Sequence, residues 1–213
     1  MAKLAGGLLS LFFPQRCVLC GQPVPGEDLC CGPCRDAAPA VGDPTPQLAH
    51  AVPSLAVFGY RGTVRRAILR LKQEGDLRTA AFLAREMTAL LVGEHAPAAF
   101  DCITYVPMQP DREAHRGYNQ AGILAELVGE ATGLPVRDDL LTRDGVFVQH
   151  QLAASFRQKS APVSFLPQEG ATLRGERVLL VDDVVTTGST VIACGRVLRQ
   201  LGAARVVALS AAR

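Results

Sequence analysis

Hydrophobic and polar positions follow two alternating periods along most of the chain after residue 49. Short, almost wholly apolar runs predict buried strands at 52–60, 102–106, 178–181 and 205–211. Apolar residues at helical spacing predict helices over 63–72, 76–92, 119–132 and 190–201. Apolar strands that alternate with amphipathic helices predict a parallel sheet covered by helices on both faces, which is an α/β fold. Residues 140–177 show no regular pattern.

Single residues mark several helix ends in this pattern. Asp76 and Asn119 stand where N-caps are expected, since their side chains can accept hydrogen bonds from the first turn. Gly133 follows the last apolar residue of the 119–132 helix and is expected to end it in a left-handed conformation.

The first quarter of the chain has a different composition. Residues 1–13 are apolar with a single lysine but lack a small-residue cleavage site, so we expect a short apolar helix in a cytoplasmic protein, not an export signal. Residues 35–53 are rich in Ala, Pro, Gly and Asp, which is typical of a linker. We therefore expect two units: 1–48 with the apolar segment, a cysteine-rich module and the linker, and 49–213 with the α/β domain.

Composition narrows the functional classes. Of 213 residues, 48% are hydrophobic and 20% are charged, which excludes a disordered chain. A formal net charge of +2 means that any nucleic-acid binding must depend on a local patch. No apolar run reaches the roughly 20 residues that a membrane-spanning helix needs.

Five of the seven cysteines lie close together, at 17, 20, 30, 31 and 34. Cys17 and Cys20 form one CxxC knuckle and Cys31 and Cys34 form another, a spacing typical of a structural zinc site with four thiolate ligands. Cys30 is then a spare, because using it in place of Cys31 breaks the second knuckle. The alternatives are a pair of disulfides, which the odd cysteine count disfavours, and a redox CxxC.

The strongest chemical signal is the run V-L-L-V-D-D-V-V-T-T-G-S-T at 178–190. A buried strand delivers Asp182 and Asp183 at its carboxyl end, where open α/β sheets bind ligands. A hydroxyl-rich loop then leads into a helix, whose backbone N–H groups can surround a phosphate. Its residues are Thr186, Thr187, Gly188, Ser189 and Thr190. A phosphate cradle beside two diol acceptors predicts a ribose 5-phosphate site; the alternative is an ordinary strand–turn–helix with solvated acids.

This run closely resembles the signature of type I phosphoribosyltransferases. The resemblance implies that Asp182 and Asp183 hold the ribose hydroxyls of phosphoribosyl pyrophosphate at the catalytic centre, while residues 186–190 bind its 5′-phosphate. It also implies that Mg²⁺ accompanies the pyrophosphate. The expected fold is thus a type I phosphoribosyltransferase-like parallel sheet flanked by helices, with a small N-terminal zinc-binding module.

Nearly the whole chain is similar to the ComF family of competence-associated proteins. Besides the four-cysteine module, the similarity is carried by Y-R-G-T-V-R-R-A-I-L-R-L-K at 60–72, Y-V-P-M at 105–108 and H-R-G-Y-N-Q-A at 115–121. The family resemblance implies a role in natural competence: transformation through DNA uptake and the handling of incoming single-stranded DNA. One departure is that Arg157 is followed by Gln158, Lys159 and Ser160, where the family usually has an Asn.

Two further groups of basic residues are candidate sites. Arg112 and Arg116 lie in the segment 109–120, which by resemblance is a mobile loop over the site; Arg116 is expected to contact pyrophosphate, and His115 is a weaker candidate as a general base. A strip without acidic residues is a candidate surface for nucleic-acid phosphates or, alternatively, a solvated helix face. It consists of Arg61, Arg65, Arg66, Arg70 and Lys72.

Three functional hypotheses remain open. The protein is an active phosphoribosyltransferase acting on a base or amine, a competence factor that keeps the sugar-phosphate pocket for binding, or an interaction module that docks a helicase or DNA-uptake partner through its zinc finger. The expected partners are phosphoribosyl pyrophosphate or a related ribose 5-phosphate ligand, single-stranded DNA and competence or helicase proteins. A homodimer is one candidate assembly.

Overall fold

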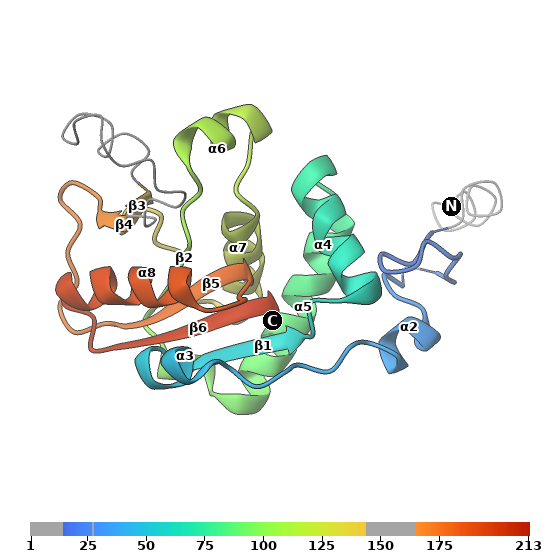
Figure 1. Ribbon diagram of the computed structural model, residues 1–213, viewed down its shortest axis with the longest axis horizontal. Helices are drawn as coiled ribbons and strands as arrows, with labels where there is room; N and C mark the ends of the chain where they lie inside the picture. Colours follow the sequence, from blue (N-terminus) through green and yellow to red (C-terminus); the bar gives the residue numbers. More distant parts are fainter. Residues whose placement is uncertain (1–14, 27, 144–164) are drawn as a thin grey trace, which may run out of the picture.

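The computed structural model describes residues 15–26, 28–143 and 165–213 (Figure 1). Its centre is a sheet of four parallel strands in the order β1-β6-β5-β2. The strands are β1 (Ser54–Phe58), β2 (Cys102–Tyr105), β5 (Arg177–Val184) and β6 (Arg205–Ala212). The predicted parallel sheet is confirmed, and the carboxyl ends of its strands share one edge.

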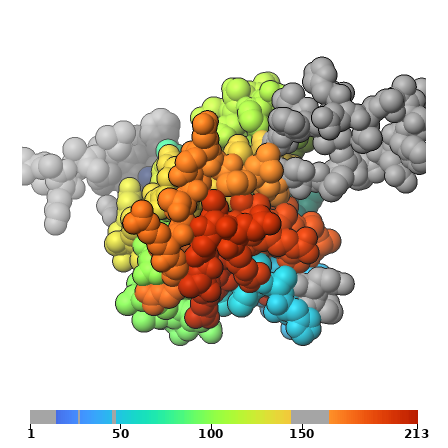
Figure 2. Space-filling model, turned by 90° about the vertical axis from the view of Figure 1, so that its left-hand side faces the viewer, coloured from blue at the N-terminus to red at the C-terminus, as the bar shows by residue number. Residues whose placement is uncertain are grey.

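Helices cover both faces of this sheet, as the apolar pattern predicts. One face carries α4 (Gly62–Glu74), α5 (Leu77–Glu94) and α7 (Gln120–Thr132); the other carries α3 (Pro46–Ala51) and α8 (Ser189–Gln200). Successive residues of β5 point to opposite faces, with Leu179 and Val181 in the first core and Val178 and Leu180 in the second. In Figure 2 the C-terminal part of the chain, in orange and red, forms much of the visible surface, with α3 in cyan against it.

Helix ends agree with the expected capping residues. The Asp76 carboxylate accepts hydrogen bonds from the backbone N–H groups of Arg78 and Thr79, and the Asn119 side chain accepts one from Ala121 N. Gly133 ends α7 in the left-handed conformation, with φ of 74°. The strand predicted at 178–181 continues to Val184. Both aspartates therefore belong to the last residues of the strand itself.

Two expectations about irregular segments need correction. The segment expected to be linker contains α3, whose Leu48 is fully buried against α8. The stretch without a regular pattern contains two short antiparallel strands, β3 (Leu141–Arg143) and β4 (Phe165–Pro167). A short 3₁₀ helix also precedes β2, at Pro97–Ala99. The predicted helix over 1–13 and the segment around Arg157 lie outside the described residues.

The cysteine-rich module lies beside α4, at the opposite end of the molecule from the β3–β4 pair (Figure 1). It contains α2 (Gly32–Asp36) and a single antiparallel bridge between Arg16 and Pro23. Val18, Leu19 and Val24 are buried in the same core cluster as the inner face of α4. The Arg70 guanidinium on α4 also donates to the Val18 carbonyl. Within the part of the chain that the structure describes, no helix is long and apolar enough to cross a membrane.

Candidate functional site

Two adjacent carboxylates lie at the carboxyl end of β5. Asp183 is only 7% exposed, and its Oδ2 lies 2.9 Å from the ammonium Nζ of Lys72 on α4. Its backbone N–H donates to Asp182 Oδ1 over 2.8 Å. The fold therefore places two acids side by side in a largely buried position, where a single lysine pairs with one of them.

Burial and the neighbouring charge of Asp183 raise the pKa of Asp182 to about 8. The Asp183 N–H group and the charges of Lys72 and Arg143 oppose this shift but do not cancel it. Near neutral pH the pair therefore tends to keep a proton. A cation or a hydrogen-bond donor placed on the pair would favour its ionised form.

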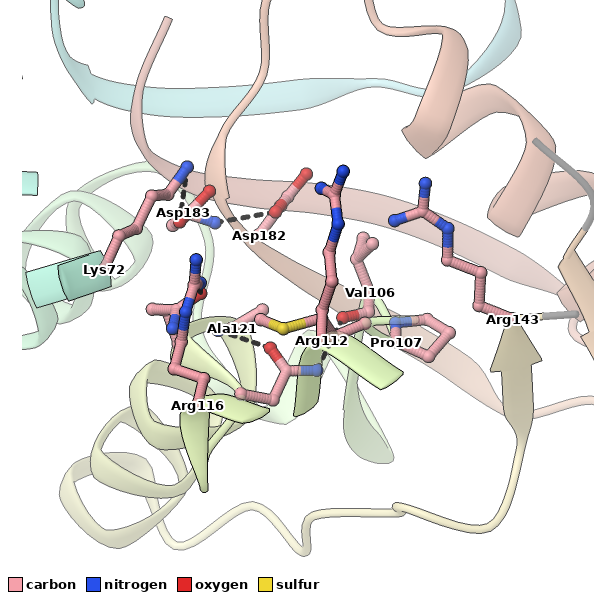
Figure 3. A pocket seen from close by; sticks show the side chains of 12 residues that line it. Lys72, Val106, Pro107, Arg112, Arg116, Ala121, Arg143, Asp182 and Asp183 are labelled. Atoms are coloured by element: carbon pink, nitrogen blue, oxygen red, sulfur yellow. Dashed lines mark hydrogen bonds and ion pairs between the residues drawn. The ribbon is translucent and has the colours of Figure 1, made fainter. Parts of the chain in front are cut away.

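A cavity of about 210 Å³ opens in front of the two acids. Four cationic side chains surround it (Figure 3), namely Lys72, Arg112, Arg116 and Arg143. Lys72 reaches Asp183 from one side, and Arg143 enters at the end of β3 on the other. Arg112 and Arg116 come from α6 (Pro110–Arg116), so the segment expected as a loop contains a short helix. We call this cavity the acid pocket; its excess of cations over carboxylates suits a polyanionic group.

A second, smaller hollow of about 30 Å³ lies at the N-terminus of α8. It is lined by the loop after β5 and by Asp182, which also lines the acid pocket. Ser189 and Thr187 are joined through their hydroxyls at 3.2 Å, and the Thr45 hydroxyl donates to the Thr187 carbonyl at 3.0 Å. The predicted hydroxyl-rich loop of residues 186–190 thus lines a small polar hollow. Thr45, which caps α3, is hydrogen-bonded to this loop.

Gly188 has two separate reasons to be glycine. Its φ of 81° lies in the left-handed region, and a Cβ at this position would come within 2.8 Å of the Leu48 side chain. The close approach therefore involves α3 packed beneath the loop, in addition to any ligand above it.

The predicted basic strip does not form one continuous surface. Arg61, Arg65 and Arg66 are exposed, whereas Arg70 binds the Val18 carbonyl and Lys72 faces the acid pocket. The Lys72 ammonium instead reaches the Asp183 carboxylate near the end of β5. The candidate surface for nucleic acid is thereby reduced to three arginines.

Sequence reasoning did not assign three polar residues to the acid pocket. Gln120 and Arg143 were not candidates, and Lys72 was a candidate only for the basic strip. Arg143 falls in the stretch where no element was predicted. Two signals were present for the others: Gln120 belongs to the run H-R-G-Y-N-Q-A at 115–121, and Lys72 is a charged residue directly after the inward-facing positions of α4. His115 is exposed on α6 and is absent from the residues that line the pocket.

The ligand atoms of Cys17, Cys20, Cys31 and Cys34 all lie within 4.8 Å of one another. The sulfur atoms of Cys20 and Cys31 are 3.7 Å apart. A tetrahedral zinc with Zn–S bonds of about 2.3 Å requires S···S separations of roughly 3.8 Å, so the four sulfurs fit that ion. Cys30 is buried, with its sulfur 4.0 Å from that of Cys17 and directed to the Cys31 carbonyl. The ligand set predicted from the two knuckles is the set that the fold brings together.

The ligand thiols do not share one pKa shift: burial and neighbouring thiols raise the pKa of Cys34, and that of Cys31 is raised as well, whereas that of Cys17 is lowered. Burial acts to raise the pKa of Cys17, but the N–H groups of Cys20, Cys31 and Leu19 outweigh it and lower that pKa to about 6. By contrast, burial and the proximity of Cys17 raise the pKa of Cys30 to about 12, which keeps it a thiol. The four sulfurs leave no open ligand position, so the module is a structural zinc site.

Comparisons with known proteins match both parts of the chain. The phosphoribosyl transferase domain family matches residues 130–212, and the double zinc ribbon domain family matches residues 8–48. The DNA utilization protein YhgH of Salmonella typhimurium is 32% identical over 197 residues, covering 89% of this chain and 80% of the relative. Competence protein ComFC of Streptococcus pneumoniae is 29% identical over 163 residues, covering 74% of this chain and 67% of the relative.

The solved structures that match are distant in sequence. An adenine phosphoribosyltransferase from Thermoanaerobacter pseudethanolicus is 18% identical, with a TM-score of 0.43 over 67% of this chain and 72% of that chain. That similarity is too low to transfer any residue. The type I phosphoribosyltransferase-like sheet with an N-terminal zinc-binding module agrees with the domain matches and with the strand order.

Proposed function

This chain belongs to the ComF family of competence and DNA utilization proteins, and from that premise we propose that its α/β domain binds phosphoribosyl pyrophosphate together with Mg²⁺. One observation carries the proposal: Asp182 lines both the small hollow at the α8 N-terminus and the acid pocket. A ligand that fills both has its middle over the two acids. Phosphoribosyl pyrophosphate has that form, with a phosphate at one end, a diol in the middle and a pyrophosphate at the other.

Each part of this ligand meets a group of matching chemistry. The 5′-phosphate accepts hydrogen bonds from the hydroxyls of Thr187 and Ser189 and from the N–H groups that begin α8. The ribose hydroxyls donate to Asp182 and Asp183. The pyrophosphate lies among the cationic side chains of the acid pocket. Hydrogen-bond donation by the ribose would also favour ionisation of the acid pair.

The donor set at the acids suits Mg²⁺ only in company with a ligand. Mg²⁺ is usually held by one or two carboxylates plus substrate phosphates and water, and Asp182 and Asp183 supply the carboxylate part. When bound, the ion would neutralise charge on the pyrophosphate. Lys72 lies on Asp183 in the structure and keeps that carboxylate paired without a metal.

Transfer of the ribosyl group to an acceptor is a second candidate function. A cavity of about 500 Å³ adjoins the acid pocket, and the two share Pro107, Met108 and Asn119. Its lining includes Tyr105 and the acidic residues Glu113, Asp138 and Asp139, which suits an aromatic or amine acceptor. In the reaction an acceptor nitrogen attacks C1, the C1–O bond breaks, pyrophosphate leaves with the bonding electrons, and the nitrogen releases a proton to solvent. A screen of bases and amines for pyrophosphate release tests this candidate.

Calorimetric titration of phosphoribosyl pyrophosphate into the zinc-loaded protein with Mg²⁺ tests the first proposal. We expect saturable binding that the Asp182→Asn/Asp183→Asn variant loses by at least about a hundredfold, since two charge-assisted acceptors disappear. The variant should remain folded, as judged by circular dichroism and thermal unfolding. No binding at millimolar ligand by the folded wild-type protein would refute the proposal.

The names of the relatives, competence protein ComFC and DNA utilization protein YhgH, support a role in competence and DNA utilization. We propose that this role includes the handling of incoming single-stranded DNA. The exposed residues Arg61, Arg65 and Arg66 are the part of the basic strip that remains available for phosphates. Titration of single-stranded DNA at two salt concentrations tests this role. We expect affinity to fall with salt, and the triple alanine variant to reduce that dependence. The division at residues 48 and 49, docking of a helicase or uptake partner by the zinc module, and a homodimer remain predictions.

A further inference from the structure

Unpaired hydrogen-bond donors are concentrated in the acid pocket. Among the described residues, three buried side-chain atoms lack a partner: Thr88 Oγ1, Gln120 Nε2 and Arg143 Nε. The last two belong to residues that line the acid pocket, and both are N–H donors. Buried donors are seldom left unpaired in folded proteins, because each forfeits its hydrogen bonds to water. Two such donors in one cavity indicate a ligand rich in acceptor oxygens.

The orientation of the Gln120 amide is determined by its neighbour. Arg116 Nη1 donates to Gln120 Oε1 over 2.7 Å, and Gln120 is only 3% exposed. The reverse orientation would direct the amide NH₂ at the guanidinium, which has no acceptor. Arg116 therefore holds the amide oxygen, and the Nε2 donor of this pocket-lining residue is left without a partner.

Arg143 is held in a similar way from the other side of the pocket. Its guanidinium lies over the Phe165 ring, with Cζ 5.7 Å from the ring centroid. This cation–π contact holds the side chain beside the pocket without pairing Nε, which stays without a hydrogen-bond partner. Burial lowers the pKa of Arg143, which shows that the charge is only incompletely solvated.

We propose that Gln120 Nε2 and Arg143 are direct donors to a pyrophosphate group in the acid pocket, and that Arg116 is a positioning residue that acts through Gln120. This inference rests on the proposed function and deepens it. It changes the role expected for Arg116, whose guanidinium was predicted to contact the pyrophosphate itself. A neutral amide donor adds specificity for acceptor oxygens without adding to the positive charge of the pocket.

The test uses two probes that correspond to the two ends of phosphoribosyl pyrophosphate. Inorganic pyrophosphate and ribose 5-phosphate are each titrated calorimetrically with Mg²⁺. Gln120→Glu keeps the shape of the side chain and its pairing with Arg116 but replaces the Nε2 donor by an acceptor oxygen and adds a negative charge. We expect it to weaken pyrophosphate binding about tenfold to a hundredfold, and to change ribose 5-phosphate binding less than about threefold. Gln120→Met removes the donor without adding a charge and should also weaken pyrophosphate binding. The matched control is Gln200→Glu, the same substitution at an exposed position on α8, which should leave both affinities unchanged.

The role of Arg116 has its own test. Arg116→Lys keeps a donor for Gln120 Oε1 and should retain most of the pyrophosphate affinity, whereas Arg116→Met should lose about tenfold. In a Gln120→Met background the Arg116→Met substitution should then have little further effect, because the two residues act as one unit. An equal loss in both backgrounds would show that Arg116 contacts the anion directly and would overturn its positioning role.

Failure of this inference can be told apart from failure of the proposed function. If the wild-type protein binds neither probe nor phosphoribosyl pyrophosphate, the proposed function is wrong. If it binds pyrophosphate and Gln120→Glu binds it equally well, only the inference about Gln120 is overturned. Arg143→Leu gives a second, independent reading, with the same loss expected for pyrophosphate and not for ribose 5-phosphate.

Discussion

The cysteine cluster and the acid pocket both gather groups of like charge, but they offset the repulsion differently. In the cluster, four sulfurs lie within 4.8 Å, and backbone N–H groups lower the pKa of Cys17. In the pocket, Asp182 and Asp183 lie at the end of β5, and Lys72 of α4 forms an ion pair with Asp183. A single cation can complete the first site, whereas in the second two residues that line the cavity carry donors without a partner.

This difference distinguishes a structural metal site from a pocket that we propose binds a ligand from solution. The four sulfurs can fill every position of a tetrahedral ion, so no ligand from solution can enter without displacing a cysteine. The acid pocket combines carboxylates, cations and unpaired amide and guanidinium donors around about 210 Å³ of space. The proposed anion would supply acceptor oxygens to these donors.

Disrupting the cluster should have the largest effect. Cys31→Ser removes one of four zinc ligands, and structural zinc contributes roughly 10–16 kcal/mol to small zinc-binding folds. We expect loss of bound zinc by elemental analysis and loss of amide protection over residues 15–36, while the α/β domain keeps its own unfolding transition. Cys30→Ser is the matched control, since Cys30 lies outside the ligand set; it should retain one zinc per chain. Zinc loss in the control but not in Cys31→Ser would overturn the assigned ligands.

The same difference explains how much of each site could be predicted. All four zinc ligands lie within residues 17–34, so the spacing of the cysteines along the chain was enough to predict the ligand set. For the acid pocket, the sequence indicated Asp182, Asp183 and the arginines of α6 as local motifs. The roles of Gln120 and Arg143 could not be assigned, because they depend on how α7 packs against β5 and β3 lies beside α8, a long-range arrangement that no local pattern encodes. The four strands of the parallel sheet and the helix caps were predicted well, since burial on both faces and capping residues give local sequence patterns.

The pH dependence of stability should show the second-largest effect. The pKa of Asp182 rises from an ordinary 3.8 to about 8 in the folded protein. The folded state therefore binds more protons than the unfolded state between these values, and stability falls as the pH rises from about 4 to about 8. We expect a difference on the order of a few kcal/mol between urea unfolding at pH 5 and pH 8. Asp182→Asn should flatten this slope; a slope unchanged in that variant would assign it to other groups.

Replacing Lys72 should lower the free energy of unfolding by less than the pH change does. Lys72→Met leaves Asp183 without its partner and should lower stability by about 1–3 kcal/mol at pH 8, with a smaller loss at pH 5, where the acid pair can hold a proton. The second substitution Asp183→Asn should restore most of the loss, because it removes the unpaired charge. Chemical denaturation of the single and double variants at both pH values measures these terms. An equal loss at both pH values would show that Lys72 acts through its aliphatic packing.

The smallest effect tests whether the two regions are linked. Three successive residues of α4 contact different parts of the molecule: Arg70 donates to the Val18 carbonyl of the zinc module, the Leu71 carbonyl accepts from the Tyr118 hydroxyl, and Lys72 pairs with Asp183. Arg70→Ala should weaken the docking of the module by about 1 kcal/mol, seen as faster hydrogen exchange over residues 15–26. Exposed Arg66→Ala is the control on the same helix. If Arg70→Ala also weakens pyrophosphate binding about twofold to threefold, α4 transmits the position of the module to Lys72. If binding is unchanged, the zinc module and the acid pocket are energetically separate, and they share the helix only as a scaffold.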